Sequence, residues 1–87
     1  MSKSKVTYYT QDNCSFCVAL EPHLRVFVDA MDLDLETVDV TGRFSVLKEV
    51  GGTVTPYLTL DTEEGKFILE ERRVAAMIYE YKRLTQT

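Results

Sequence analysis

The two cysteines, Cys14 and Cys17, limit most strongly what this chain can fold into. They are the only cysteines among 87 residues, and just two residues separate them. Residues 5–10, which precede them, are rich in β-branched and aromatic side chains and predict a strand. The residues that follow, up to about Met31, repeat apolar side chains at helical spacing and predict a helix. The pair is therefore expected where a strand gives way to a helix.

The junction between the predicted strand and helix favours an ionised, reactive cysteine. The first N–H groups of a helix have no partner within the helix, and the helix dipole stabilises negative charge there, so a thiolate is favoured over a thiol. We expect Cys14 to be the nucleophile and Cys17, one turn further and more buried, to break the mixed disulfide that Cys14 forms with a substrate. Ser15 is expected to donate a hydrogen bond to the Cys14 thiolate. Phe16 either exposes its ring beside the sulfurs as an apolar contact for a substrate or packs on the domain's own surface.

Other uses of the cysteine pair are an inert disulfide, two buried apolar cysteines or a metal site. A zinc site needs about four ligands, whereas the chain holds two cysteines and one histidine, His23. We therefore expect no metal and no bound organic cofactor. His23 is expected on the surface, just beyond Pro22. Pro22 lies within the helical pattern, and its ring and missing N–H predict one kinked helix.

The helix that contains Pro22 is expected to have Asp12 or Asn13 as its capping residue. Its apolar side chains recur at spacings of three and four, which predicts one buried face. The members of that face are Cys17, Leu20, Leu24, Phe27 and Met31.

The remaining chain alternates between short strand patterns and helical patterns. Strands are predicted at 35–40, 54–60 and 67–69, with a hairpin loop at 61–66. A short helix ends at Gly51-Gly52 and is expected to bury one face, formed by Phe44, Leu47 and Val50. A final helix over 72–84 is expected to bury a stripe formed by Val74, Met77, Ile78, Tyr81 and Leu84.

The predicted order is β-α-β-α-β-β-α, an α/β fold. The first β-α-β unit implies a right-handed crossover between parallel strands, and the late hairpin implies antiparallel ones. The sequence therefore predicts a mixed four-stranded sheet flanked by three helices. A chain of 87 residues suffices for a single domain, predicted over residues 1–87.

Composition excludes several classes of partner. The formal net charge is −4, whereas nucleic-acid binding calls for a basic face. No apolar run approaches the roughly 20 residues that cross a bilayer. Residues 1–5 lead into the first strand without the apolar region of a secretory signal. We therefore expect no nucleic acid, no membrane and a reducing cytoplasmic setting, in which a lone pair of closely spaced cysteines is typically redox-active or metal-binding.

In size and in the order of its elements, the chain resembles the thioredoxin fold in its minimal, glutaredoxin-sized form, as in small bacterial and bacteriophage proteins. Three motifs carry the resemblance: Cys14-Ser15-Phe16-Cys17 after the first strand, Pro22 in the following helix, and Thr55-Pro56 at the head of a later strand. The resemblance implies that the Thr55–Pro56 bond is cis and that Pro56 lies against the disulfide. It also implies that the backbone of Thr55 pairs with a substrate strand.

Three positions depart from the family pattern. Asn13 precedes Cys14, where thioredoxins have a tryptophan, and Tyr8 stands where thioredoxins carry a buried acid on the first strand. Tyr8 is interpreted as strand packing. The segment 69–73, Leu-Glu-Glu-Arg-Arg, stands where glutaredoxins bind glutathione through Gly-Gly and Asp. The carboxylates of Glu70 and Glu71 would repel those of glutathione, and the adjacent arginines would compensate in part.

The residues and the resemblance together imply a protein-disulfide reductase that transfers two electrons through Cys14 and Cys17. Ser15, Phe16, Thr55 and Pro56 would contact the substrate. The expected partners are disulfide-containing proteins, with ribonucleotide reductase as one example, and a thioredoxin- or glutaredoxin-type reductase or glutathione as the electron source. The protein is expected to be a monomer. The alternatives are a glutathione-dependent glutaredoxin and a non-catalytic binding or adaptor module with this fold.

Overall fold

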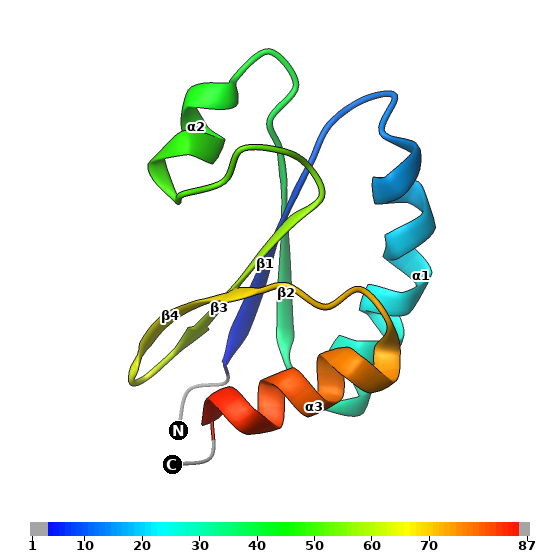
Figure 1. Cartoon of the computed structure of the whole chain (residues 1–87), viewed down its shortest axis with the longest axis vertical. Helices are drawn as coiled ribbons and strands as arrows, with labels where there is room; N and C mark the ends of the chain where they lie inside the picture. The colour runs from blue at the N-terminus through cyan, green and yellow to red at the C-terminus, as the bar shows by residue number, and fades with distance from the viewer. Residues whose placement is uncertain (1–3, 86–87) are drawn as a thin grey trace.

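The structure, a computed structural model, describes residues 4–85 and consists of one sheet with three helices (Figure 1). The predicted order of elements is confirmed. The elements are β1 (Lys5–Thr10), α1 (Ser15–Ala30), β2 (Asp34–Asp39), α2 (Phe44–Glu49), β3 (Tyr57–Thr62), β4 (Gly65–Leu69) and α3 (Val74–Thr85). Residues 1–3 and 86–87 of the predicted domain lie outside the described residues.

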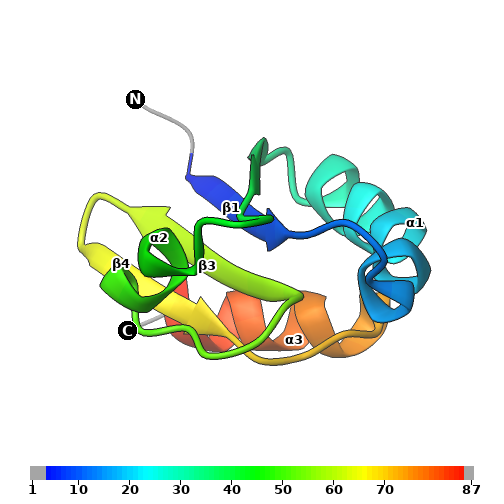
Figure 2. The same cartoon turned by 90° about the horizontal axis from the view of Figure 1, so that it is seen from above.

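The four strands lie in the order β2-β1-β3-β4, so β2 and β4 form the edges of the sheet. β1 pairs with β2 in parallel, and β3 pairs with β1 and with β4 in antiparallel fashion. This confirms the predicted mixed sheet. Helices α1 and α3 cover one face, and the short helix α2 lies on the other (Figures 1 and 2). Within residues 4–85, no helix is both long and apolar enough to span a bilayer.

The larger core lies between the sheet and the two long helices. Because side chains alternate along a strand, β1 contributes Val6 and Tyr8 to this core and Tyr9 to the opposite face, as its pattern predicts. α1 is a single helix through Pro22, and its predicted apolar face is buried except for Met31, which follows the helix and is half-buried. From α3, Met77 is fully buried. The partly buried members of the predicted α3 stripe that pack on this core are Ile78, Tyr81 and Leu84.

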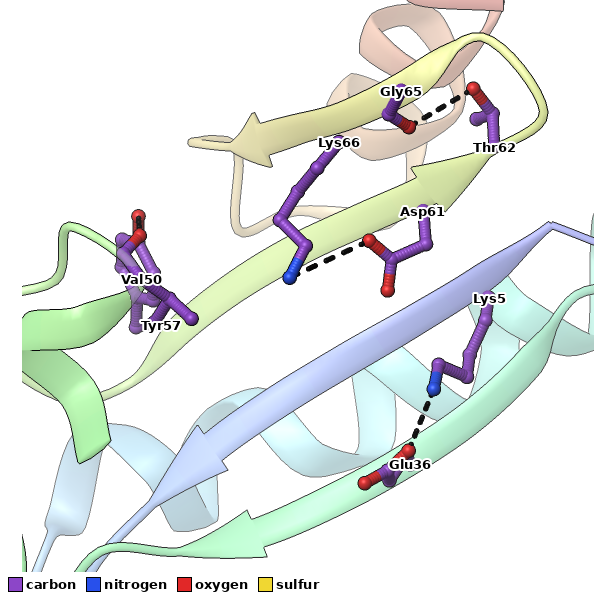
Figure 3. Close-up of polar contacts among 8 residues, drawn as sticks. All are labelled: Lys5, Glu36, Val50, Tyr57, Asp61, Thr62, Gly65 and Lys66. Atoms are coloured by element: carbon purple, nitrogen blue, oxygen red, sulfur yellow. Dashed lines mark hydrogen bonds and ion pairs between the residues drawn. The ribbon is translucent and has the colours of Figure 1, made fainter.

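The smaller core lies under α2 and corrects one prediction. Leu47 is buried and Val50 half-buried there, as expected, but Phe44 is 45% exposed and Val46 packs in its place. Successive steps of three residues drift around a helix of 3.6 residues per turn, so Phe44 is rotated away from the side that Val46, Leu47 and Val50 share. The Tyr57 hydroxyl donates to the Val50 carbonyl over 2.8 Å and joins α2 to β3 (Figure 3).

Away from α2, polar side chains line this face of the sheet. Lys5 pairs with Glu36 across β1 and β2, and Lys66 pairs with Asp61 across β4 and β3 (Figure 3). These charged residues alternate with core residues along the strands. Their side chains therefore lie on the side of the sheet that the long helices do not cover. The face therefore carries polar groups where no helix shields it from water.

Several element boundaries differ from the prediction. β3 begins at Tyr57 and not at Val54, because Pro56 has no N–H to donate to the ladder and the preceding residues form a loop. β3 extends to Thr62 and β4 begins at Gly65, and together these changes shorten the hairpin turn to residues 63–64. α3 begins at Val74, and β2 is displaced by one residue, to Asp34–Asp39.

Gly52 lies where a side chain would not fit. A Cβ atom there would come within 2.6 Å of Leu47 Cδ1 and 3.0 Å of Tyr57 Cδ2. We expect Gly52→Ala to lower the free energy of unfolding by about 1–3 kcal/mol, because the buried Leu47 has to move. Urea denaturation measures this. The control is Ser45→Ala on the exposed side of α2, expected within about 0.5 kcal/mol of the parent; equal stability of Gly52→Ala and the parent would contradict the close packing.

Candidate active site

The cysteine pair lies where β1 leads into α1. Asn13 turns the chain with a positive φ of 59°, and Cys14 is the N-cap of α1. Its Sγ accepts a hydrogen bond from the Cys17 backbone N–H over 3.1 Å. The predicted caps, Asp12 and Asn13, are therefore wrong, because the helix starts one position later and the sulfur itself occupies the capping position. Asp12 instead donates its backbone N–H to the Thr41 hydroxyl.

Cys14 and Cys17 form a disulfide, with their Cα atoms 5.2 Å apart. Cys17 is 1% exposed and belongs to the larger core, whereas Cys14 is half-buried and packs at the edge of that core. This confirms the expected difference in burial between the two sulfurs. A reagent from solution reaches Cys14 far more readily than Cys17.

The loop before β3 meets this disulfide. The Thr55–Pro56 peptide bond is cis, as the resemblance implied. The Thr55 hydroxyl donates to Cys14 Sγ over 3.6 Å, so two segments that are distant in sequence come together at the sulfur. Two donors thus reach Cys14 Sγ: the backbone N–H of Cys17 and the hydroxyl of Thr55. Either would stabilise a thiolate there.

The two residues between the cysteines are both exposed. Phe16 is 76% exposed, so its ring faces solvent and does not pack on the domain's own surface. Ser15 is exposed as well, and its hydrogen bond to the Cys14 thiolate stays a prediction. Beside Phe16 lies a pocket of about 360 Å³. It is lined by Phe16, Ala19, Leu20, His23, Pro56 and Arg72.

Arg72 ties this pocket to the loop that carries Pro56. Its guanidinium donates to the carbonyl oxygens of Leu69 and Glu71, each over 2.9 Å, and to that of Pro56 over 3.2 Å. Burial lowers the pKa of the Arg72 guanidinium, and the negative charges of Glu80, Glu70 and Glu71 raise it. Of the segment 69–73, which stands where glutaredoxins bind glutathione, Arg72 is the residue that lines the pocket.

Glu80, which sequence reasoning missed, anchors the segment after β4 that carries Arg72. It is only 5% exposed, and its carboxylate accepts the backbone N–H groups of Glu70 over 3.0 Å and of Glu71 over 3.2 Å. A buried carboxylate needs such donors. The available signal was its position three residues after Met77, on the side of α3 that faces the core.

Tyr8 does more than pack within the sheet. Its buried hydroxyl lies 3.0 Å from the Cys17 carbonyl oxygen, 3.1 Å from Glu21 Oε2 and 3.3 Å from Thr10 Oγ1. Burial raises the pKa of the Tyr8 hydroxyl, the hydrogen bond with Thr10 lowers it, and Glu21 raises it. Sequence reasoning missed Glu21, for which the signal was its position four residues after Cys17.

The residues that could hold a metal do not gather. Among residues 4–85, no group of three or more His, Cys, Asp or Glu side chains is placed to bind a metal ion. His23 is exposed, as expected, and faces the pocket beside Phe16.

Comparison with known proteins identifies the fold. No family model and no curated protein matches the sequence. Thioredoxin 1 from Thermosipho africanus TCF52B superposes with a TM-score of 0.68 at 23% identity, over 95% of this chain and 99% of that one. Mitochondrial thioredoxin 3 from Saccharomyces cerevisiae, in its oxidized form, gives a TM-score of 0.75 at 20% identity, over 95% and 80%.

The J-Trx1 fragment of ERdj5 gives a TM-score of 0.79 at 16% identity; 98% of this chain is covered but only 44% of the fragment. This chain thus spans less than half of that longer protein. The chain has the thioredoxin fold, with a disulfide-bonded cysteine pair at the start of α1. At these identities the likeness shows the fold, and the activity has to be argued from the site itself.

Substitution of Thr55 tests whether its hydroxyl stabilises the Cys14 thiolate. In the reduced protein, Thr55→Val removes one donor to Cys14, so the midpoint of its alkylation by iodoacetamide should move up by about one pH unit. The direction follows because a lost donor destabilises the thiolate relative to the thiol. Thr55→Ser keeps the hydroxyl and should titrate like the parent. An unchanged midpoint in Thr55→Val would show that the hydroxyl does not stabilise the thiolate.

Arg72 offers a second test. A lysine cannot span three carbonyl groups, so Arg72→Lys should lower the free energy of unfolding by about 1–2 kcal/mol through unpaired carbonyls. Thermal unfolding of the oxidised protein measures the loss. Arg73→Lys, at the exposed neighbouring position, is the matched control and should unfold like the parent. If Arg72→Lys and Arg73→Lys unfolded at the same temperature, Arg72 would not be anchoring the loop that carries Pro56.

Proposed function

We propose that this protein is a thiol–disulfide oxidoreductase that reduces protein disulfides through Cys14 and Cys17. The observation that carries the proposal is the placement of the pair: one half-buried sulfur caps a helix and receives two hydrogen bonds, and its partner lies in the core. An inert disulfide needs neither the donors nor the difference in exposure.

The reaction proceeds by two exchanges between sulfurs. The Cys14 thiolate attacks one sulfur of a substrate disulfide, forms a Cys14–substrate disulfide and releases the first substrate thiolate. The Cys17 thiolate then attacks the Cys14 sulfur, and the second substrate thiolate leaves. The Cys14–Cys17 disulfide forms, and the substrate gains two electrons and two protons. The Cys14–Cys17 disulfide of the structure is the form expected after both exchanges.

The different burial of the two sulfurs supports this order of steps. Cys14 can reach a substrate, and the helix N-terminus together with the Thr55 hydroxyl stabilises its negative charge. Cys17 lies where a large substrate cannot enter, so it reacts only with the disulfide that Cys14 has already formed. The mixed disulfide is thus resolved from within the protein.

The surface around Cys14 suits a protein substrate. Phe16, Val18 and Val54 all expose most of their side chains, and Val18 lines the same pocket as Cys14. Apolar groups of a partner would bury them on docking. We propose cytoplasmic protein disulfides as the substrates, with ribonucleotide reductase as one candidate, and a monomeric enzyme recharged by a thioredoxin- or glutaredoxin-type reductase.

Glutathione is disfavoured as the electron source by the segment after β4. The Arg72 guanidinium is engaged by three carbonyls, and the side chains of Glu70 and Glu71 are exposed nearby. A glutathione-dependent enzyme would reduce hydroxyethyl disulfide efficiently with glutathione and glutathione reductase. Slow turnover in that assay, alongside rapid insulin reduction with dithiothreitol, is the pattern that we expect.

Single cysteine variants test the proposal. Cys14→Ser should reduce insulin no faster than dithiothreitol alone, because the attacking sulfur is gone. Cys17→Ser should retain the attack but stall as a mixed disulfide, visible by mass spectrometry and cleaved by excess thiol. Full function of a Cys14→Ser, Cys17→Ser variant would instead support a non-catalytic adaptor. Insulin reduction by Cys14→Ser at the parent rate would sink the proposed activity.

A further inference from the structure

Polar groups lie on the core-facing side of the cysteine pair, and the two sulfur exchanges proposed above involve none of them. The Tyr8 hydroxyl, buried under α1, touches both the Cys17 carbonyl oxygen and the carboxylate of Glu21. Cys17 and Glu21 are four residues apart on one helix and so lie on the same side of it. Tyr8 therefore holds a carboxylate beside the turn that carries the buried sulfur.

The hydrogen-bond capacity of these groups leaves Glu21 free to accept a proton. A tyrosine has a single O–H, so Tyr8 cannot donate fully to Cys17 and Glu21 together. The Thr10 hydroxyl, 3.3 Å away, can donate to the Tyr8 oxygen. An ionised carboxylate has about four acceptor sites, of which Tyr8 occupies at most one on Glu21.

A pocket connects this carboxylate to the sulfurs. Its volume is about 530 Å³, and Cys14, Cys17 and Glu21 all line it together with the polar turn before α1. Polar and apolar groups both contribute to its lining, and it is large enough to hold water. A proton acceptor can act directly or through one water molecule, and this pocket permits the second route between Cys17 and Glu21.

We propose that Glu21, held in place by Tyr8, takes the proton from the Cys17 thiol when Cys17 breaks the mixed disulfide. The inference rests on the proposed function. Cys17–SH passes its proton through water to the Glu21 carboxylate, and the resulting thiolate attacks the Cys14 sulfur. The Cys14–Cys17 bond forms as the bond between Cys14 and substrate breaks, the electron pair leaves with the substrate sulfur, and Glu21 then returns the proton to solvent or to that sulfur.

The residues that share a pocket with Glu21 come from three parts of the structure, and two of these parts contribute a charge. Asp12, from the turn before α1, lines the pocket that holds the cysteines. Arg25 lies one turn further along α1 and lines a second, smaller pocket with Glu21 and Tyr8. β2 contributes the uncharged Leu35 and Thr37 to that smaller pocket. Asp12 therefore shares one pocket with Glu21, and Arg25 shares the other.

The two steps can be timed separately with an aromatic disulfide, dithiobis(nitrobenzoate), whose thiolate product is coloured. Mixing with a slight excess of reduced protein releases a first thiolate when Cys14 attacks and a second when Cys17 resolves the adduct. In Glu21→Gln the amide oxygen still accepts from Tyr8, but the side chain takes no proton at neutral pH. We expect an unchanged first phase and a second phase slowed about tenfold.

Alkaline pH provides the deciding readout. Cys17 then loses its proton to solvent without help, so the second phase of Glu21→Gln should approach that of the parent. Glu63→Gln, at the exposed turn between β3 and β4, is the control for the lost charge and should match the parent in both phases. An unchanged second phase, equal slowing of both phases, or slowing that alkaline pH does not relieve would each overturn the role of Glu21. A parent protein with no first phase would count against the proposed function instead.

Discussion

The antiparallel pairing of β1 with β3 is the constraint on which the site depends. The pairing sets Tyr9, near the end of β1, opposite Tyr57, at the start of β3. The segment that leads from β1 to Cys14 therefore lies beside the segment, through Thr55 and Pro56, that leads into β3. In this register the Thr55 hydroxyl reaches the Cys14 sulfur. A slip of one residue would also exchange the side chains that face α1 with those that face α2.

Buried polar groups then hold the site from two sides. On one side Arg72 joins the segment after β4 to the carbonyl of Pro56, and Glu80 fixes the backbone of that same segment. On the other side Tyr8 joins the centre of the sheet to the first turn of α1. Losing a partner from a buried hydrogen bond costs more than the bond itself contributes, so each contact restrains its loop strongly. One pocket lies beside Phe16 and Pro56, and a second is lined by both cysteines and Glu21.

Local patterns in the sequence predicted most of the fold. The order of elements, the mixed sheet and the burial of Cys17 follow from periodicity and from the position of the cysteines, whereas the sequence left open whether Phe16 is exposed or packed. The cis bond before Pro56 followed from the resemblance. Tertiary contacts lay beyond such patterns. Nothing near Tyr8 in sequence signals that its hydroxyl meets Glu21, and Glu80 resembles any surface acid until α3 packs on the sheet. Phe44 was misplaced because a helix as short as α2 buries too few residues for its spacing to define a face.

The edge strand β2 has a consequence for the protein at high concentration. An open sheet edge exposes backbone groups that another chain can extend, and proteins counter this with charged edges. β2 exposes the acidic side chains of Asp34, Glu36 and Asp39 along its length. Two copies approaching through this edge would bring like charges together as the backbones tried to pair. The strand thus discourages fibrous self-assembly, while a cationic extended peptide would meet no such barrier.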